Sequence, residues 1–373
     1  MRKINSKRLA RSVESRMAYD LDNNNINAAS VIIKQGGESV YSNNFGLANE
    51  KSVYRIASMT KPITAAAIMT LFDKGLLSID DAVSRYLPNF SALYLAEINK
   101  NKDVIKAKPL NNQLTIKHLL THSSGLLNGI SGEIYYKEMT DEQNRTLRNA
   151  VDFYSDCAVE FEPFTRQEYN PTAAFDVLAR IVEVVSGKQF EEYLKESIFT
   201  PLNMMDTTFV PTDQQWKRIV KMHDKKNGKS VEGITYDGCV FEKTPVSHTL
   251  GGAGLISTIN DYSNFAEMLL NGGLLFGKRI LSQRSVKMIS TPQISEEIMP
   301  LNERWGLGVR VIVGEDDELP MGSYGWSGAY GTHFWVDNEN MITAVYMKNS
   351  KYDGGSGAVT AANFEKDVYN SFN

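Results

Sequence analysis

Ser58 and Lys61 are the two residues of this chain whose types and spacing most directly indicate chemistry. An apolar run ends at Ala57 and an Ala- and Met-rich run follows, which predicts a helix that begins near Ser58. Residues three apart on a helix share a face, so Lys61 can contact the Ser58 hydroxyl. A serine is activated as a nucleophile by a nearby base, and the N–H groups at a helix start favour negative charge. The pair therefore indicates acyl transfer, with the Ser58 N–H as one donor to the oxyanion.

The S-x-x-K pattern is not specific by itself, because about one or two chance matches are expected at average residue usage in a chain of this length. No other serine in the sequence is followed by a lysine three positions later. The alternative interpretation is a helix with Ser58 near its N-cap and Lys61 in water. The segments around the pair, and two segments far from it, decide between the interpretations.

The composition is that of an ordinary globular protein. The chain has 373 residues, of which 42% are hydrophobic and 23% charged, and its net charge is −4. It is long enough for a large core, in one large domain or two interleaved ones. No basic run stands out beyond the N-terminal region, so nucleic-acid binding is disfavoured.

The N-terminal region carries no recognisable targeting segment. Its basic residues are not followed by the apolar block of a secretory signal, and no run reaches the roughly 20 apolar residues of a membrane span. Residues 6–19 are predicted to form an amphipathic helix that packs on the body. The two cysteines, Cys157 and Cys239, lie in no paired-ligand motif and are expected to be small buried hydrophobes. The expected location is the cytoplasm.

Strand patterns occur at both ends of the chain, with helical patterns between them. Residues 28–34 and 38–46 read as a hairpin, and further strands are predicted at 307–313, 332–336 and 341–347. The predicted helices cover residues 58–74, 175–186, from Asn260 or Asp261 to about Leu270, and 357–371. Residues 205–250 are polar and predict long loops or short strands. The terminal strands are therefore expected to meet in one sheet, with the helical segment inserted between them.

Two further segments carry candidate site residues. Tyr169 lies in a predicted loop just before the 175–186 helix, and a tyrosine near a cation can take a proton from serine because opposite charge favours the phenolate. Residues 325–331 are rich in small side chains, which let a substrate lie against a strand edge, and the N–H of Ala329 is the second candidate oxyanion donor. Each segment has a simpler interpretation: a half-buried loop aromatic for Tyr169, and a core residue for Trp326.

Five segments, read together, resemble the serine β-lactamase-like superfamily, in the branch of class C β-lactamases, D-Ala-D-Ala peptidases and family VIII esterases. They occur in the family's order at residues 54–64, 76–81, 114–126, 201–209 and 251–255. The resemblance implies an α+β fold of three layers (α/β/α), with a central antiparallel sheet, flanking helices and an inserted helical region. We expect residues 1–75 and 235–373 to form the α/β part, residues 76–234 to form the helical part, and the site to lie in the groove between them.

The resemblance also implies roles for particular residues. Ser58 matches the nucleophile, Lys61 the lysine that assists it, and Tyr169 the general base and later acid. The N–H of Ala329 shares the oxyanion hole with that of Ser58. Whether Lys61 or Tyr169 is the base stays open, since such a pair can titrate as a unit. No metal or cofactor is expected.

Two departures from the family pattern concern substrate binding. Pro171 stands where the family has a polar residue, so its contact is absent or displaced to Asn170. Trp326 stands where β-lactamases and peptidases carry lysine or histidine, and Trp-x-Gly resembles family VIII esterases. A cation at that place favours substrates with a carboxylate, whereas tryptophan offers an apolar wall. The expected substrate-binding residues are Asn170, Trp326, Ser327 and Gly328.

Other candidate chemistries are weaker. His118 and His122 lack a third acidic ligand in their pattern and are interpreted as structural, and His333 as a strand residue. There is no G-x-S-x-G elbow, and residues 251–254 are a tight turn and not a phosphate loop.

The preferred hypothesis is a serine hydrolase that forms an acyl-enzyme and acts on short acyl esters or small amides. A β-lactamase or D-amino-acid peptidase is the alternative within this class. A penicillin-binding or sensor-like module with little turnover is the alternative from another class. The expected partner is a small-molecule ester, amide or lactam, with no nucleic acid, and the sequence is silent on oligomeric state.

Overall fold

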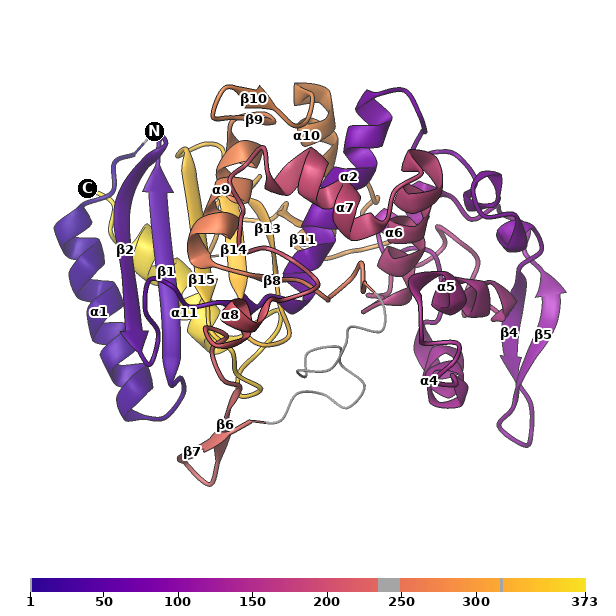
Figure 1. The fold of residues 1–373 in the computed structure, drawn as a ribbon, viewed down its shortest axis with the longest axis horizontal. Helices are drawn as coiled ribbons and strands as arrows, with labels where there is room; N and C mark the ends of the chain where they lie inside the picture. The colour runs from indigo at the N-terminus through magenta and orange to yellow at the C-terminus, as the bar shows by residue number, and fades with distance from the viewer. Residues whose placement is uncertain (1, 234–248, 316–317) are drawn as a thin grey trace.

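A seven-stranded antiparallel sheet joins the two ends of the chain (Figure 1). The computed structural model describes residues 2–233, 249–315 and 318–373. The spatial order of the strands is β11-β12-β13-β14-β15-β1-β2, so the N-terminal hairpin completes a sheet built mainly from the C-terminal region. The strands, in chain order, are β1 (Ala28–Gln35), β2 (Glu38–Gly46), β11 (Glu303–Trp305), β12 (Arg310–Ile312), β13 (Tyr324–Ser327), β14 (His333–Asp337) and β15 (Ile342–Met347).

The β1–β2 hairpin forms where it was predicted. Gly36 and Gly37 are its two turn residues, and both have positive φ, as a tight two-residue hairpin turn requires. β1 is a continuous apolar run because the sheet is covered on both of its faces. Ala29, Val31 and Ile33 face one layer of helices, and Ala28 and Ile32 face the other.

Helices cover both faces of the sheet, which gives three layers. Helix α1 (Ser6–Asp22) and helix α11 (Val359–Tyr369) pack together on one face, where their apolar side chains share a core with β1, β14 and β15. Helix α9 (Ile259–Leu270) packs on the other face, beside helix α2 (Thr60–Asp73) in a second and larger core. The predicted α+β fold class is confirmed, as is the amphipathic N-terminal helix.

The mainly helical part lies at the end of the molecule opposite α1 (Figure 1). It packs against the sheet-containing part chiefly through α2, which contacts helix α6 (Ala173–Ser186). Gly187 ends α6 in the left-handed conformation, as the sequence predicts. Within the described residues, the other helices between α2 and α9 are α3 (Ile116–Leu120), α4 (Gly129–Glu138), α5 (Leu147–Asp156), α7 (Phe190–Leu194) with a π-turn at Lys195–Phe199, and α8 (Asp213–Trp216).

The remaining elements are short. The paired strands are β3 (Tyr54–Arg55) with β8 (Ile256–Ser257), β4 (Tyr94–Ile98) with β5 (Val104–Pro109), β6 (His223–Lys226) with β7 (Lys229–Glu232), and β9 (Leu274–Leu275) with β10 (Lys278–Arg279). The remaining helical segments are the 3₁₀ turns Ala57–Met59, Val83–Arg85 and Pro88–Ser91, and α10 (Gln283–Ile289). No helix in the described part of the chain is both long and apolar enough to cross a membrane.

Some boundaries differ from the sequence prediction. Helix α9 is capped by Thr258, whose side chain accepts from the N–H of Asp261, and not by Asn260 or Asp261. The strand predicted over 307–313 is only β12, because Gly308 has a positive φ and breaks the extended chain before it. The predicted loops of 205–250 contain α8, β6 and β7, while residues 234–248 and Cys239 lie outside the described residues. Cys157 is buried, as expected. The division into parts at residues 75 and 235 stays a prediction.

Candidate active site

The backbone bends sharply just before Ser58. β3 ends at Arg55, and the N–H of Ile56 bonds the carbonyl of Leu255 beside β8. Ala57 then has a φ of 44°, a left-handed conformation that a residue with a side chain seldom adopts. Strained backbone of this kind is concentrated at functional sites, where the surrounding structure holds it in place. Ser58 therefore begins a helical turn and does not continue the strand.

Two side chains meet at the Ser58 hydroxyl. The Tyr169 hydroxyl donates to Ser58 Oγ at 2.8 Å, and Lys61 Nζ donates to the same oxygen at 3.3 Å. The Tyr169 distance is in the range of hydrogen bonds that can carry a proton transfer, and the Lys61 distance lies just beyond that range. The structure thus brings together the three residues that the sequence proposed as catalytic, although Tyr169 is 111 residues away in the chain.

Lys61 is fully buried and held by neutral oxygens. Its ammonium donates to the carbonyl of Pro171 at 2.7 Å and to that of Gly252 at 2.9 Å, in addition to Ser58. These three acceptors match the three donors of an ammonium group. The ring of Tyr169 lies 5.0 Å from Nζ, within the range of a cation–π interaction. Nζ of Lys61 is therefore held in one place beside the serine and the tyrosine.

Aromatic rings surround Tyr169. Its ring centre lies 4.6 Å from that of His122, 5.3 Å from that of Trp326 and 6.0 Å from that of Trp305. The indole N–H of Trp326 also points to the Tyr169 hydroxyl, at 3.4 Å. Trp326 and Trp305 contact each other edge to face. Tyr169 is thus held by stacking as well as by hydrogen bonds.

Trp305 is a neighbour of Tyr169 that the sequence does not predict. Trp305 lies in no motif, so only the fold places it beside Tyr169. His122 was interpreted as structural, and it is: its Nδ1 accepts from the N–H of Asn170 at 3.0 Å. Burial, and to a lesser extent the Lys61 charge, hold the pKa of His122 well below its usual value. A neutral His122 thus orients the loop that carries Tyr169. His118, likewise interpreted as structural, accepts from the N–H of Thr115 at the start of α3.

Asn170 does not face a substrate. It is fully buried, and its amide group donates to the carbonyl of Leu126 and accepts from the N–H groups of Thr172 and Ala174. These bonds satisfy free backbone groups at the start of α6. The expectation that Asn170 binds substrate is therefore corrected: its side chain fixes the turn that follows Tyr169.

The end of β13 lies against the backbone beside Ser58. Trp326 faces Tyr169, but side chains alternate along a strand, and Ser327 instead bonds His333 Nδ1 on the neighbouring strand at 2.8 Å. The hydroxyl of Ser327 is thus committed to His333, a β14 residue as predicted, and not to a substrate as expected. A Cβ on Gly328 would lie 2.3 Å from the carbonyl oxygen of Ile56, so only glycine permits this approach.

The Gly328–Thr332 turn carries Ala329. The Gly328 N–H bonds the Thr332 carbonyl at 2.7 Å, and the Thr332 hydroxyl bonds the Ile56 carbonyl at 3.0 Å. Gly328 therefore acts through its small size, because its N–H belongs to the turn. Within the described residues, the N–H of Ala329 has no hydrogen-bond acceptor. A free donor is thus attached to the strand that touches the nucleophile's own backbone.

Comparison with known proteins shows the family. The β-lactamase family model matches residues 9–365. The chain belongs to the β-lactamase family. It is 28% identical to esterase EstB of Burkholderia gladioli over 371 residues, which cover 90% of this chain and 88% of the esterase. It is 27% identical to a putative D-alanyl-D-alanine carboxypeptidase of Escherichia coli K12, over 81% of this chain and 70% of that protein.

A solved structure shares the whole fold. EstCE1, described as a hydrolase with promiscuous acyltransferase activity, superposes with a TM-score of 0.82 over 98% of this chain and 99% of that one, at 21% identity. The esterase and peptidase relatives indicate that this member of the β-lactamase family is a serine hydrolase.

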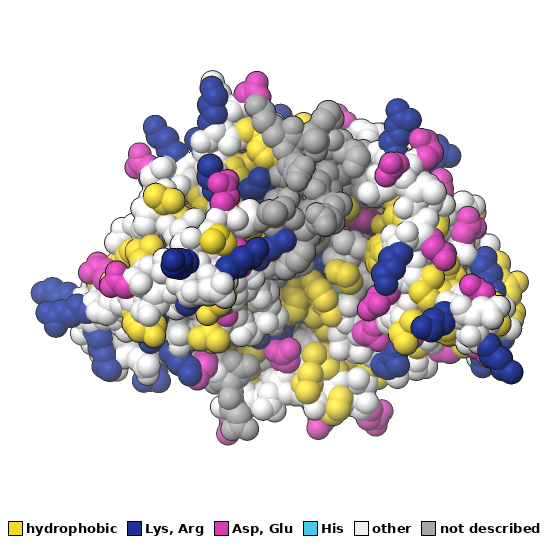
Figure 2. Space-filling model, turned by 90° about the horizontal axis from the view of Figure 1, so that it is seen from below, with side chains coloured by type: hydrophobic (Ala, Val, Ile, Leu, Met, Phe, Trp, Pro, Cys, Tyr) yellow, Lys and Arg dark blue, Asp and Glu magenta, His cyan; other side chains and the backbone are white. Residues whose placement is uncertain are grey.

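The face of this family member seen from below in Figure 1 is hollowed near its middle. Figure 2 shows hydrophobic side chains in the hollow, with Lys, Arg, Asp and Glu around it. The N-terminal end of α2 points toward this side of the molecule (Figure 1).

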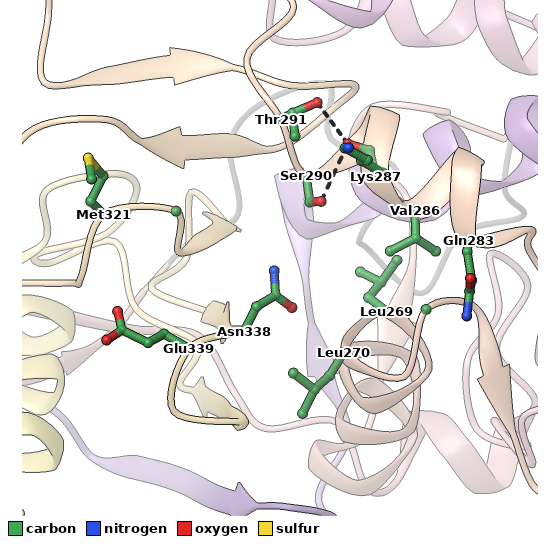
Figure 3. A pocket seen from close by; sticks show the side chains of 12 residues that line it. Leu269, Leu270, Gln283, Val286, Lys287, Ser290, Thr291, Met321, Asn338 and Glu339 are labelled. Atoms are coloured by element: carbon green, nitrogen blue, oxygen red, sulfur yellow. Dashed lines mark hydrogen bonds between the residues drawn. The ribbon is translucent and has the colours of Figure 1, made fainter. Parts of the chain in front are cut away.

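A separate cavity of about 500 Å³ lies between α9, α10 and the β14–β15 turn (Figure 3). Its charged lining residues are Lys287 and Glu339. The hydroxyls of Ser290 and Thr291 are committed to the Lys287 carbonyl, as Figure 3 shows. This cavity shares no residue with the Ser58 site.

Proposed function

We propose that this protein is a carboxylesterase that acts on small acyl esters or amides through an acyl-enzyme at Ser58. The observation that carries the proposal is the contact of Ser58 Oγ with both the Tyr169 hydroxyl, at 2.8 Å, and Lys61 Nζ, at 3.3 Å. A nucleophile held within hydrogen-bond reach of a base, which is itself oriented by a third group, is the arrangement that covalent catalysis uses.

In the proposed reaction Tyr169 is the base and Lys61 the fixed cation. Lys61 fits that part because its ammonium donates to the carbonyls of Pro171 and Gly252 and to the Ser58 hydroxyl, which gives each of its three N–H groups an acceptor. Tyr169, as phenolate, takes the Ser58 proton while Ser58 Oγ attacks the acyl carbon. The Lys61 charge stabilises the negative charge of the pair.

The tetrahedral intermediate places its oxyanion between the N–H groups of Ser58 and Ala329. When it collapses, the bond to the leaving oxygen or nitrogen breaks, and Tyr169 returns the proton to that atom. A water molecule then repeats the sequence on the acyl-enzyme, giving its proton to Tyr169 and releasing the acid and free Ser58.

The aromatic wall supports an uncharged acyl group. Trp326 stands beside Tyr169 where the related peptidases and β-lactamases are expected to present a cation, and Trp305 adds a second indole ring against Tyr169. An apolar wall binds an alkyl chain by excluding water and gives a substrate carboxylate no partner. The esterase relative supports the same substrate class.

The peptidase relative supports a second candidate, cleavage of a D-amino-acid peptide or a β-lactam. A sensor-like module that is acylated once is the third. These three candidates differ in turnover and in substrate, so one set of assays separates them.

The test is steady-state hydrolysis of p-nitrophenyl acetate and butyrate by the wild type and by Ser58→Ala, with a chromogenic cephalosporin alongside. The proposal predicts ester turnover that disappears in Ser58→Ala, and little cephalosporin cleavage. Turnover that survives in Ser58→Ala would refute the nucleophile. A single burst without turnover would favour the sensor-like module, and efficient cephalosporin cleavage would favour a β-lactamase.

A further inference from the structure

A line of buried hydrogen bonds runs from β13 to the C-terminal helix. The Ser327 hydroxyl bonds His333 Nδ1 at 2.8 Å, and His333 Nε2 bonds Glu365 Oε1 on α11 at 2.7 Å. Ser327, His333 and Glu365 are 6%, 3% and 6% exposed. Buried polar groups are stable when they are hydrogen-bonded, so the fold holds these three side chains in place by pairing them. The reaction proposed above does not use it.

The line begins at the end of β13 that is paired with only one neighbouring strand. On one side, β12 pairs with β13 at Tyr324 and Gly325. On the other, β14 pairs with β13 as far as Ser327 and His333, the last pair before the Gly328–Thr332 turn. Trp326 and Ser327 are therefore held from one side only. The Ser327–His333 bond adds a side-chain tie at the pair that adjoins the turn carrying Ala329.

The other end of the line is anchored by charge. Arg310 on β12 lies 3.8 Å from the same Glu365 oxygen and also pairs with Glu303. Burial pushes the pKa of Glu365 upward, but the His333 hydrogen bond and the charges of His333 and Arg310 leave it below its ordinary value. Glu365 is thus a carboxylate at neutral pH, and a carboxylate can only accept at His333 Nε2.

That constraint fixes the direction of the whole line when His333 is neutral. Nε2 carries the ring proton and donates to Glu365, so Nδ1 is left as an acceptor. The Ser327 hydroxyl must then donate to Nδ1, which holds its rotamer on the α11 face of the strand. A carboxylate–histidine pair commonly orients the imidazole for the group on its other nitrogen.

We propose that His333 and Glu365 are positioning residues that act through Ser327 to hold the Ala329 N–H in the oxyanion hole. The inference rests on the proposed function, because it assigns these residues to the same reaction. Serine, histidine and glutamate in this order match a hydrolase triad in composition. Burial of Ser327 and His333 gives them a supporting part and not the part of nucleophile and base.

The first test compares Glu365→Gln with Asp367→Asn. Asp367 is a matched control because it is also a buried carboxylate of α11, and it bonds Ser12 on α1 at 2.6 Å, not a residue of the sheet. We expect Glu365→Gln to lower kcat for p-nitrophenyl butyrate about tenfold with KM within about twofold, a fraction of the loss that follows removal of one oxyanion donor. Asp367→Asn should keep the wild-type kcat.

The second readout is inhibition by an alkyl boronic acid, which bonds a catalytic serine as a tetrahedral adduct. Its inhibition constant should rise in Glu365→Gln in parallel with the loss of kcat, because the adduct needs the oxyanion donors and the bound substrate does not. Ser327→Ala, which removes the tie and leaves Glu365 paired with His333 and Arg310, should give the same pattern. It serves as the second variant if Glu365→Gln does not fold.

The outcomes are distinct. If Glu365→Gln keeps the wild-type kcat and boronate affinity, and Glu365→Gln and Asp367→Asn lower the melting temperature by similar amounts, the line is only structural and the inference fails. Acylation of Ser327 by the ester would also overturn it. If the wild type shows no Ser58-dependent turnover, the proposed function fails and the inference with it.

Discussion

Each residue of the candidate site has a neighbour that explains its state. Ser58 has Tyr169 and Lys61 at its hydroxyl, Lys61 has the carbonyls of Pro171 and Gly252, and Tyr169 has three aromatic rings. Only the Ser58–Lys61 contact follows from spacing along one helix. The others join remote segments, so from the sequence they follow only through the family resemblance. The contacts of Asn170 and Ser327 follow from neither, because they depend on which way each side chain points.

Tyr169→Phe tests the proposed base. The change removes the hydroxyl that contacts Ser58 and keeps the stacked ring, so kcat should fall by about 10²–10⁴ with little change in melting temperature. Tyr193→Phe is the control, because that buried hydroxyl bonds Thr70 and Lys74. Steady-state kinetics with p-nitrophenyl butyrate measures both. Full activity of Tyr169→Phe would assign the base to Lys61.

Trp326→Lys tests what the apolar wall selects. A cation at this position should attract a carboxylate on the acyl chain. We therefore expect kcat/KM for mono-p-nitrophenyl succinate, relative to that for p-nitrophenyl butyrate, to rise about tenfold, equivalent to about 1.4 kcal/mol. Trp326→Met, which stays apolar, should leave the ratio unchanged. An equal ratio of the two kcat/KM values in all three proteins would show that Trp326 does not select the substrate.

At the scale of elements, short turns and not long helices bring the site together. The 251–254 turn supplies the Gly252 carbonyl to Lys61, and the Gly328–Thr332 turn packs on Ile56. Glycine is needed at both because other atoms come very close. A Cβ on Gly252 would lie 2.9 Å from the Pro171 carbonyl oxygen and 3.2 Å from Lys61 Nζ.

Gly252→Ala should therefore impair catalysis by displacing Lys61. A shift of a fraction of an ångström at a catalytic group is enough to lower kcat about tenfold. Gly187→Ala is the contrasting change: its φ is 71° with open space around the missing Cβ, so it should cost about 1 kcal/mol of stability and leave kcat unchanged. Kinetics and urea unfolding on both variants check this. Equal kcat values would contradict it.

Long periodic elements could be predicted from the sequence, whereas short ones could not. The β1–β2 hairpin, α2, α6 and the closing helix have clear apolar patterns or glycine ends. The β4–β5 hairpin was missed because β5 is almost fully exposed and lacks an alternating apolar face. The predicted α9 cap was two or three residues too late because Thr258, Asn260 and Asp261 are all good caps, and only the tertiary position of β8 selects the first.

At the scale of the whole molecule, the candidate site lies where the helical region meets the sheet. Ser58 comes from the 3₁₀ turn just before α2, Tyr169 from the loop before α6, and Ala329 from the turn after β13. The β-lactamase-family fold thus unites three parts of the chain at one place. α11 covers the far face of the same sheet, and its Glu365 bonds His333 on β14, which in turn bonds Ser327 on β13.

The stability of the protein in acid should depend on Glu365, whose bond to His333 joins α11 to the sheet. Its pKa is lower in the folded protein than the ordinary 4.5, so the carboxylate stabilises the fold above about pH 4.5, and this contribution is lost as the pH falls through the folded value. Arg310 and His333 are the charged or titratable groups that face it. The difference in unfolding free energy between wild type and Glu365→Gln should be constant near neutral pH and shrink below pH 4.5. Urea unfolding across this range measures it, and a difference independent of pH would contradict the assignment.

The central claim is that Ser58 carries the acyl group. The most direct measurement is rapid quenching of the wild type during turnover of p-nitrophenyl butyrate, followed by peptide mass spectrometry to locate the butyryl group. We predict a butyryl ester on Ser58, formed at least as fast as the steady-state rate and absent from Ser58→Ala. A butyryl group on any other residue formed at that rate, or steady turnover with no acyl-enzyme while Ser58→Ala keeps full activity, would contradict the mechanism.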